Sequence, residues 1–457
     1  MEENNLAKFD GNQIQKVADA IAITDKILGK EIPIPEEAEK LYAEADAKYD
    51  LKEFKAATEL LTKAIAVYPE YTRAFNLRGL AKKKIKDFDG AMEDFNKSIT
   101  IDPKKAVSYY HRGYLKDDLK DYNGAVEDFT EAISLNPDDE DFYRYRGLSK
   151  EYLKDYEGAL VDYNNAISIK PDYTRAYYLR GKLKYYRLDD NLGALDDYNK
   201  AIELDSTDED FYYERGVVKH NQSDYHGAIE DFDKSIELDG SEYFYFNSRG
   251  LSKHEVEDFQ GAIEDFDKAI ELDDYWEEFY FNRGLSKKEI QDNDGAVEDF
   301  TVAIEKDYDN PIYYIARGSA KSALQDYEEA IEDYDFAIHL KPDEAAFYNI
   351  RGLVKVDFKD FQGALDDYNQ CIKLNPTDAV YYYNRGHLKL LTVDNKGAIS
   401  DYNQTIALDP RDANSYLERG AAKYDLHDKI GACKDWSISG ELGNMRAYDL
   451  IEQYCGN

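Results

Sequence analysis

Residues 72–105 read TRAFNLRGLAKKKIKDFDGAMEDFNKSITIDPKK, and residues 106–139 read AVSYYHRGYLKDDLKDYNGAVEDFTEAISLNPDD. Both stretches carry an Arg-Gly pair at the same place, and this pair recurs along the chain every 34 residues, with one interval of 35. Its arginines are Arg78, Arg112, Arg146, Arg180, Arg215, Arg249, Arg283, Arg317, Arg351, Arg385 and Arg419. A Gly-Ala pair follows in step from Gly90 onward, with Glu329 as the one variant of its glycine. Self-similarity at a fixed period of this length indicates a repeat architecture.

Each period predicts two helices joined by a short turn, because its apolar residues fall three and four apart. Gly79 and its equivalents let the paired helices approach closely, and Phe95 and its equivalents fill the space beside them. Asp87 stands just before the second helix, where a carboxylate accepts hydrogen bonds from unpaired amides. Pro103 ends that helix because it lacks an amide proton. The extra residue of the longer interval falls in a predicted turn, at 189–192.

This pattern resembles the tetratricopeptide repeat family, in a bacterial-type array. The family signature has a bulky residue at repeat position 4, Gly at 8, Ala at 20, an aromatic at 24, a small residue at 27 and Pro at 32. The second repeat has Phe75, Gly79, Ala91, Phe95, Ser98 and Pro103 at these positions. The resemblance implies an all-α fold, a right-handed α-α superhelical solenoid of twelve 34-residue helix-turn-helix repeats over residues 38–446. The repeats start at residues 38, 72, 106, 140, 174, 209, 243, 277, 311, 345, 379 and 413.

The two ends of the chain lie outside this pattern. Residues 1–37 predict an amphipathic helix followed by a Pro-containing connector, and residues 447–457 predict a C-terminal capping helix. Repeat arrays need such caps to stay soluble. The N-terminal helix has three interpretations that the sequence leaves open: it caps the first hairpin, fills the groove or docks a partner.

Composition restricts the function classes. The chain has 58 Lys and Arg against 95 Asp and Glu, a net charge of -37, so this acidic protein repels nucleic acid and anionic membranes alike. It contains no apolar run long enough to span a membrane and no recognisable secretion signal. Cys371, Cys433 and Cys455 are too few and too scattered for a disulfide framework, which favours a reducing compartment. These features predict a cytoplasmic protein.

Two charged positions vary together between repeats. Repeats two to twelve carry Arg at position 7 and Asp at position 23, whereas the first repeat has Glu44 and Leu60 there. Joint presence and joint loss predict that each Arg pairs with the Asp of its own hairpin, since a half-buried charge needs a partner. Lys occurs at position 11 of all twelve repeats, as in Lys82. We interpret it as an architectural residue whose ammonium reaches nearby carboxylates, rather than as a basic ladder for a ligand.

Positions that differ between repeats are the candidates for binding. First helices are expected to line the concave surface of a solenoid, with positions 2, 5, 9 and 12 forming one stripe on it. Aromatic residues give large contact area there, and Asn can bond to a peptide backbone. The candidate peptide-contacting residues are Tyr110, Tyr114, Arg144, Tyr178, Lys182, Tyr185, Tyr213, Asn247 and Phe281.

The sequence therefore predicts a protein-protein interaction scaffold or adaptor that binds a peptide or protein partner on the concave face. A self-associating structural protein is the alternative, and a helical-repeat RNA binder is a third class that the negative charge disfavours. The chain shows no Gly-rich phosphate loop or catalytic constellation, which predicts no enzyme activity, no cofactor and no metal site. No repeat has the Lys at position 5 or the Asn at position 9 with which the family's chaperone clamp holds a terminal carboxylate. The oligomeric state stays open.

Overall fold

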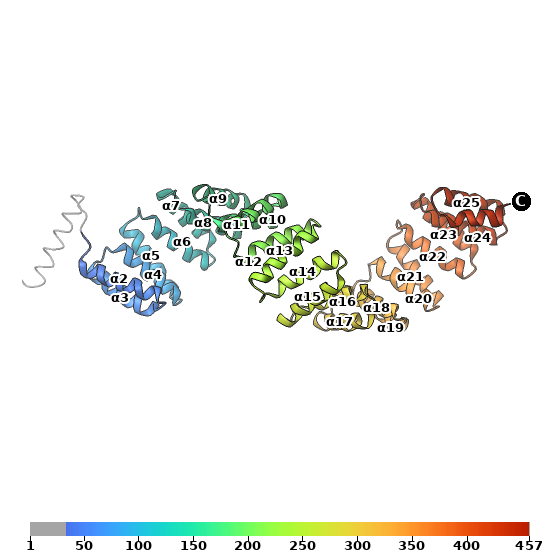
Figure 1. Ribbon diagram of the computed structural model, residues 1–457, viewed down its shortest axis with the longest axis horizontal. Coiled ribbons are helices and arrows are strands. Elements are labelled where there is room, and N and C mark those ends of the chain that lie inside the picture. The colour runs from blue at the N-terminus through green and yellow to red at the C-terminus, as the bar shows by residue number, and fades with distance from the viewer. Residues whose placement is uncertain (1–32, 457) are drawn as a thin grey trace, which may run out of the picture. The chain divides into compact units, whose positions relative to one another are not determined.

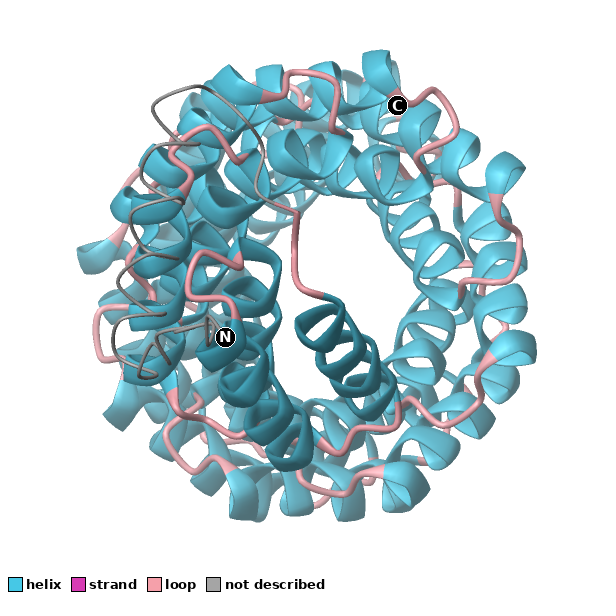
Figure 2. Ribbon diagram, turned by 90° about the vertical axis from the view of Figure 1, so that its left-hand side faces the viewer, coloured by secondary structure: helices cyan, strands magenta, loops and turns pink. Residues whose placement is uncertain are grey.

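A computed structural model describes residues 33–456 of the chain. All regular secondary structure among these residues is helical, and Figure 2 shows helices joined by loops without any strand in this range. The chain divides into two compact units, Met1–Ser206 and Thr207–Asn457. Most of the segment in which an N-terminal amphipathic helix is expected lies outside the described residues.

The described helices follow one another along the chain as labelled in Figure 1. Those of the first unit are α2 (Glu36–Asp50), α3 (Phe54–Val67), α4 (Thr72–Lys84), α5 (Phe88–Ile101), α6 (Ala106–Asp118), α7 (Tyr122–Leu135), α8 (Glu140–Tyr152), α9 (Tyr156–Ile169), α10 (Thr174–Leu188) and α11 (Asn191–Leu204). Those of the second unit are α12 (Glu209–Asn221), α13 (Tyr225–Leu238), α14 (Tyr243–Glu255), α15 (Phe259–Leu272), α16 (Glu277–Glu289), α17 (Asn293–Lys306), α18 (Pro311–Ala323), α19 (Tyr327–Leu340), α20 (Ala345–Asp357), α21 (Phe361–Leu374), α22 (Ala379–Leu391), α23 (Asn395–Leu408), α24 (Ala413–Asp425), α25 (Lys429–Glu441), α26 (Arg446–Leu450) and the π-helix η1 (Ile451–Cys455).

Consecutive helices pair as hairpins, for example α4 with α5 and α14 with α15. Within each unit, the second helix of a hairpin also packs on the first helix of the next one, as α5 does on α6 and α15 on α16. Within a unit, each hairpin therefore contacts its neighbours in sequence and buries a core with them. This arrangement is an all-α helical repeat solenoid, which confirms the fold class predicted from the 34-residue period.

In the hairpins of repeats two to twelve, a glycine of the first helix packs closely against an aromatic ring of the second. A Cβ atom on Gly79 would lie 2.5 Å from Cε1 of Phe95, and one on Gly284 would lie 2.7 Å from Cε1 of Phe300. Both phenylalanine rings are fully buried. The close approach predicted for the glycine of each Arg-Gly pair is therefore confirmed, because any larger residue would displace the ring.

The turn inside each hairpin explains the Gly-Ala pair. Lys86 adopts a left-handed φ of 65°, and the next residue, Asp87, accepts a hydrogen bond at Oδ1 from the backbone N–H of Gly90, at 3.1 Å. A Cβ atom on Gly90 would lie 2.3 Å from Oδ2 of that carboxylate, so the cap requires glycine. The repeat with Glu329 in the glycine position is a natural control, since its Asp326 makes no side-chain cap hydrogen bond. The predicted N-cap is confirmed, and its dependence on the glycine is a structural finding.

Each arginine of the Arg-Gly ladder pairs with the aspartate of its own hairpin. Asp94 is 3% exposed and accepts from Arg78 twice, with Nε 2.9 Å from Oδ2 and Nη2 2.6 Å from Oδ1. The Nζ of Lys82 lies 2.9 Å from Oδ2 of the same carboxylate. The same Arg-Asp-Lys triad recurs in the ten later repeats. Both the pairing and the architectural role of the lysine are confirmed.

The third guanidinium nitrogen joins neighbouring hairpins, which the sequence pattern did not predict. The Nη1 of Arg112 donates to Oδ1 of Asn96 at 2.8 Å, and the Nη1 of Arg317 donates to Oγ1 of Thr301 at 3.2 Å. In both cases the acceptor is at position 25 of the preceding repeat. One arginine thus closes its own hairpin and bridges to the previous one.

The C-terminal helices contain a disulfide that the sequence analysis did not predict. The α26 and η1 helices pack on α25, and a disulfide joins Cys433 on α25 to Cys455 at the end of η1. Cys371 is the free, buried cysteine of the described residues. The cysteines were expected to be too few and too scattered for a disulfide framework, but folding brings two of them, 22 positions apart, into one disulfide. The cysteines therefore give no support to a reducing compartment.

We expect the disulfide to stabilise the C-terminal helices against local unfolding. Replacing Cys455 with Ser should lower the stability of the α25–η1 segment by roughly 2–4 kcal/mol, since the cross-link restricts the unfolded chain. Amide hydrogen exchange of this segment measures the change under oxidising conditions. In dithiothreitol, the parent and Cys455→Ser should exchange alike; a persistent difference would show that the serine itself perturbs the packing.

Candidate functional site

A cleft of about 290 Å³ opens between two consecutive first helices, α8 and α10, in the first unit. Its lining residues are Leu148, Glu151, Tyr152, Arg175, Tyr178, Leu179, Lys182 and Arg187. We call this the α8–α10 cleft. All of its lining residues belong to first helices, so we call the surface formed by first helices the first-helix face.

The α8–α10 cleft combines cations with aromatic rings. The guanidinium of Arg175 lies 4.7 Å from the centre of the Tyr178 ring, and the Nζ of Lys182 lies 3.4 Å from the hydroxyl of the same tyrosine. Glu151 is the one acidic side chain of the lining, and it accepts a hydrogen bond from the hydroxyl of Tyr163. Burial raises the pKa of the Glu151 carboxyl. The cleft therefore has a cationic rim in a chain that is strongly acidic.

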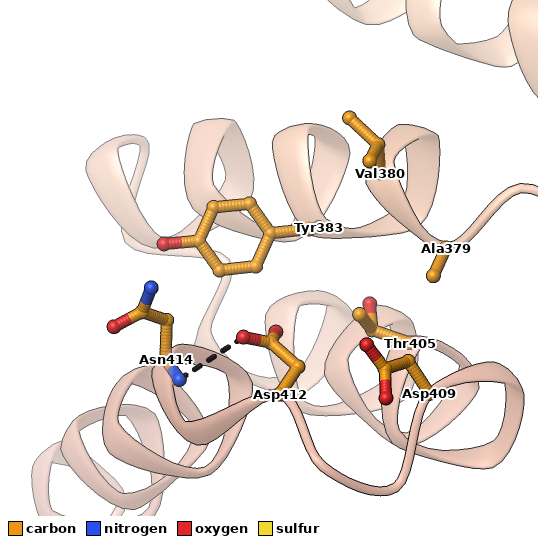
Figure 3. A pocket seen from close by; sticks show the side chains of 7 residues that line it. All are labelled: Ala379, Val380, Tyr383, Thr405, Asp409, Asp412 and Asn414. Atoms are coloured by element: carbon orange, nitrogen blue, oxygen red, sulfur yellow. Dashed lines mark hydrogen bonds between the residues drawn. The ribbon is translucent and has the colours of Figure 1, made fainter. Parts of the chain in front are cut away.

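A second cleft, of about 280 Å³, lies in the second unit between α22 and α24. Figure 3 shows its seven lining residues, Ala379, Val380, Tyr383, Thr405, Asp409, Asp412 and Asn414. The ring of Tyr383 on α22 faces the start of α24, where Oδ1 of Asp412 accepts from the backbone N–H of Asn414 at 3.2 Å. This α22–α24 cleft presents carboxylates instead of cations.

A third cleft, of about 180 Å³, lies near the beginning of the first unit. Its lining residues are Tyr42, Arg73, Asn76, Leu77, Leu80, Lys105, Val107 and His111. We call it the α4–α6 cleft, after the helices that supply most of the lining. The α8–α10 and α4–α6 clefts of the first unit are therefore cationic, whereas the α22–α24 cleft of the second unit is anionic.

Of the nine candidate residues, two line a cleft. Tyr178 and Lys182 both line the α8–α10 cleft, where Tyr178 is 4% exposed and Lys182 is partly buried. Tyr185, also partly buried, lies next in the same helix and meets the ring of Tyr186 edge to face, with 4.7 Å between ring centres. The buried position of Tyr178 means that its ring forms the floor of the cleft.

Three further candidates gather around Tyr145. The ring centres of Tyr110 and Tyr114 lie 5.6 and 5.0 Å from that of Tyr145, and the guanidinium of Arg144 lies 3.8 Å from its centre. Lys83 places its Nζ 3.2 Å from the centre of the Tyr114 ring. The structure therefore brings Tyr110, Tyr114 and Arg144 together, in a partly buried cluster between α6 and α8.

The three candidates of the second unit face the next first helix. The ring centre of Tyr213 lies 5.0 Å from that of Phe244, and the Nδ2 of Asn282 donates to Oδ1 of Asn247 at 3.4 Å. Phe281 packs on α18 in the same way. In these repeats the side chain at position 5 contacts the next hairpin. All three side chains are partly buried at that junction.

Position 12 also reaches across a junction. The Nδ1 atoms of His220 and His254 each lie 2.9 Å from a hydroxyl on the next first helix, that of Ser252 and that of Ser286. The histidines at position 12 of the expected stripe therefore also contact the first helix of the following repeat.

Several residues of the α8–α10 cleft are not among the nine predicted candidates. Arg175 is one of them, although its position 2 belongs to the predicted stripe. Tyr152 and Arg187, at positions 13 and 14, are exposed but lie outside the stripe. A search for cations on first helices of this acidic chain would have found both arginines.

Comparison with known families agrees with the repeat geometry. Models described as tetratricopeptide repeat match residues 42–106, 106–139, 209–242 and 315–379, and a model described as TPR repeat matches 152–185 and 183–223. The chain belongs to the tetratricopeptide repeat family. Tetratricopeptide repeat proteins are in general non-enzymatic interaction scaffolds, which supports a scaffold role for this chain in the same general terms.

Solved structures similar to this chain share little sequence with it. The crystal structure of the APC/C hetero-tetramer Cut9-Hcn1 is 14% identical, with 92% of this chain and 97% of that chain covered and a TM-score of 0.42. Yeast Tom70 is 19% identical, with 84% and 94% covered and a TM-score of 0.39. YrrB, described as a TPR protein with an unusual peptide-binding site, is 23% identical, with 43% and 97% covered and a TM-score of 0.38. No curated protein sequence matches the chain. Among the described residues, no helix combines the length and apolar character needed to cross a bilayer.

Proposed function

We propose that this tetratricopeptide repeat protein is an adaptor that binds a peptide or protein partner on the first-helix face. The observation that carries the proposal is the α8–α10 cleft, where aromatic and cationic side chains surround an open volume on two neighbouring first helices. Tyrosine and arginine are the residues that most often dominate binding energy at protein interfaces. The same combination continues in the cluster of Tyr110, Tyr114 and Arg144.

The dimensions of the clefts favour an extended segment of a partner. A volume of about 290 Å³ holds one or a few side chains, and neighbouring first helices repeat such positions along the face. A ligand that follows the face in an extended form places successive side chains at successive repeats.

A polynucleotide fits these observations less well than a protein. The net charge of -37 opposes a phosphate backbone, and two aspartates line the α22–α24 cleft of the second unit. The guanidiniums of the Arg-Gly ladder are not available for phosphate contacts, because each one pairs with a buried aspartate.

A library of random dodecapeptides displayed on phage tests the proposal with the full chain as bait. Peptides that the parent enriches should bind Arg175→Ala/Arg187→Ala/Tyr152→Ala about tenfold more weakly for at least one sequence class, because each substitution removes a rim contact. Fluorescence anisotropy with the synthetic peptides measures the change.

The matched control replaces Lys63 and Lys97 with Ala, since both are exposed lysines on second helices. This control should bind every selected peptide as the parent does. Equal affinity of all selected peptides for the parent and for the cleft variant would contradict the proposed function at this cleft.

A further inference from the structure

A chain of hydroxyl groups fixes the orientation of the buried Asn76 amide. Ser98 can donate its single hydroxyl proton from Oγ to the carbonyl oxygen of Thr72, at 3.3 Å. In that arrangement Ser108, whose Oγ lies 2.8 Å from that of Ser98, donates to Ser98. Ser108 can in turn accept the proton of the Asn76 Nδ2, which lies 2.9 Å away. Nδ2 is therefore the donor end of the Asn76 amide, and Oδ1 is its acceptor end.

This acceptor oxygen has no hydrogen-bond partner among residues 33–456. Asn76 is 5% exposed, and its Oδ1 is buried without a hydrogen bond. The Nδ1 of His111, which lines the same α4–α6 cleft, is also buried without a partner. Burial lowers the pKa of His111 to about 4, so the imidazole is neutral near pH 7. Leaving a buried acceptor unsatisfied costs about 1–3 kcal/mol, which a ligand donor would recover.

Two cations line the same cleft. Arg73 has a half-exposed side chain whose guanidinium lies 4.6 Å from the centre of the Tyr42 ring, and its nearest carboxylate, Glu39, is 3.9 Å away. Lys105 donates from Nζ to Oγ1 of Thr72 at 2.9 Å and forms no ion pair with any described residue. Both cations belong to residues 72–105, where nine Lys and Arg stand against five Asp and Glu. Residues 72–105 form the one repeat of the twelve that has a net positive charge.

The remaining lining of the α4–α6 cleft is apolar and comes from Leu77, Leu80 and Val107. We propose that this cleft binds an acidic residue of an extended peptide, next to an apolar residue. The peptide N–H donates to Oδ1 of Asn76, the carboxylate lies between Arg73 and Lys105, and the apolar neighbour covers the leucines. This inference rests on the proposed function and adds the chemical class of one bound residue.

A peptide satisfies the three features together better than a free anion does. An anion such as chloride or sulfate would pair with the cations but supply no donor to an amide oxygen, and any small anion would leave the apolar lining exposed. An acidic peptide residue carries a backbone N–H and a carboxylate a few ångströms apart. The unpartnered acceptor Oδ1 of Asn76 therefore favours a peptide, which has an N–H to donate, over a ligand that is bound by charge alone.

The experiment selects the dodecapeptide library on the full parent chain, on Arg73→Glu/Lys105→Glu and on Lys84→Glu/Lys97→Glu. The last pair is the control, because both lysines are exposed, lie in the same repeat and do not line the cleft. Their replacement by Glu makes the same change of net charge. The parent and the control should enrich peptides with Asp or Glu beside an apolar residue. The cleft variant should lose this class, with affinities reduced about tenfold or more.

A second measurement tests the hydrogen bond to Asn76. N-methylation of the acidic residue of an enriched peptide should weaken binding to the parent about tenfold. The same N-methylation should have no further effect on Asn76→Leu, because the acceptor is already absent. Additive losses from the two changes would overturn the assignment of the N–H to Oδ1.

The outcomes separate this inference from the proposed function. If peptides lose affinity for the α8–α10 variant while Arg73→Glu/Lys105→Glu retains the acidic class, only the inference on the α4–α6 cleft fails. If no form of the chain enriches any peptide, the inference and the proposed function fail together. Enrichment of acidic peptides that the charge control also loses would show general charge attraction and would overturn the cleft assignment.

Discussion

Asp299→Ala should lower the free energy of unfolding by roughly 3–5 kcal/mol, because it leaves two cations half buried without their carboxylate. Asp299 is 3% exposed and holds Arg283 through two hydrogen bonds, at 2.9 and 2.6 Å, with Lys287 at 2.9 Å. Urea unfolding followed by circular dichroism measures the loss. Since contacts in a repeat array are local, hydrogen exchange should place it in α16, α17 and their neighbours.

The matched control for this substitution is Glu298→Ala, the exposed carboxylate one residue earlier on the same helix. It removes the same charge without touching the triad, so its effect should stay within about 0.5 kcal/mol. If both variants lost the same stability, net charge rather than the buried triad would be the cause.

Phe266→Ala should cost a similar roughly 3–5 kcal/mol, through a cavity rather than through charge. The Phe266 ring is fully buried against the first helix of its hairpin, where a Cβ atom on Gly250 would lie 2.8 Å from its Cε1. Two backbones already in close contact cannot collapse further to fill the space. Differential scanning calorimetry of the full chain measures the loss.

Phe358→Ala is the matched control, since this phenylalanine of the same unit is 48% exposed. Its removal should cost much less than that of Phe266. Adding Gly250→Ala to Phe266→Ala should restore part of the stability, because the new methyl group occupies the space left by the ring. A double variant less stable than Phe266→Ala would contradict this account of the glycine.

The sequence was sufficient to predict features that repeat without change. The Arg-Gly spacing predicted the helical solenoid, and the joint loss of Arg and Asp in the first repeat predicted the pairing inside each hairpin. The bridge from Arg112 to Asn96 was missed because position 25 alternates among Thr, Asn and Asp. These residues share only the ability to accept a hydrogen bond, which a search for identity does not detect.

Candidate binding residues were harder to predict, because helical spacing assigns a face only to within one residue position. Repeat positions 5 and 12 lie at the edge of the first-helix face, where side chains of the next hairpin contact them. The contact of His220 with Ser252 is an example. Cleft volume depends on which neighbouring side chains are small and on their rotamers. The assignment of the nine candidates to a ligand therefore remains a prediction, whereas the grouping of Tyr110, Tyr114 and Arg144 is a property of the fold.

The arginine bridge has a mechanical consequence. Inside a hairpin, a carboxylate held by three bonds, a helix cap and a glycine-aromatic contact all resist separation of the two helices. Between hairpins of the same unit, one guanidinium nitrogen adds a bond that recurs from repeat to repeat, beside polar contacts that differ between junctions, such as Asn76 with Ser108 and His220 with Ser252. We therefore expect the compliance of a unit under tension to differ from junction to junction, whereas its hairpins are uniformly stiff.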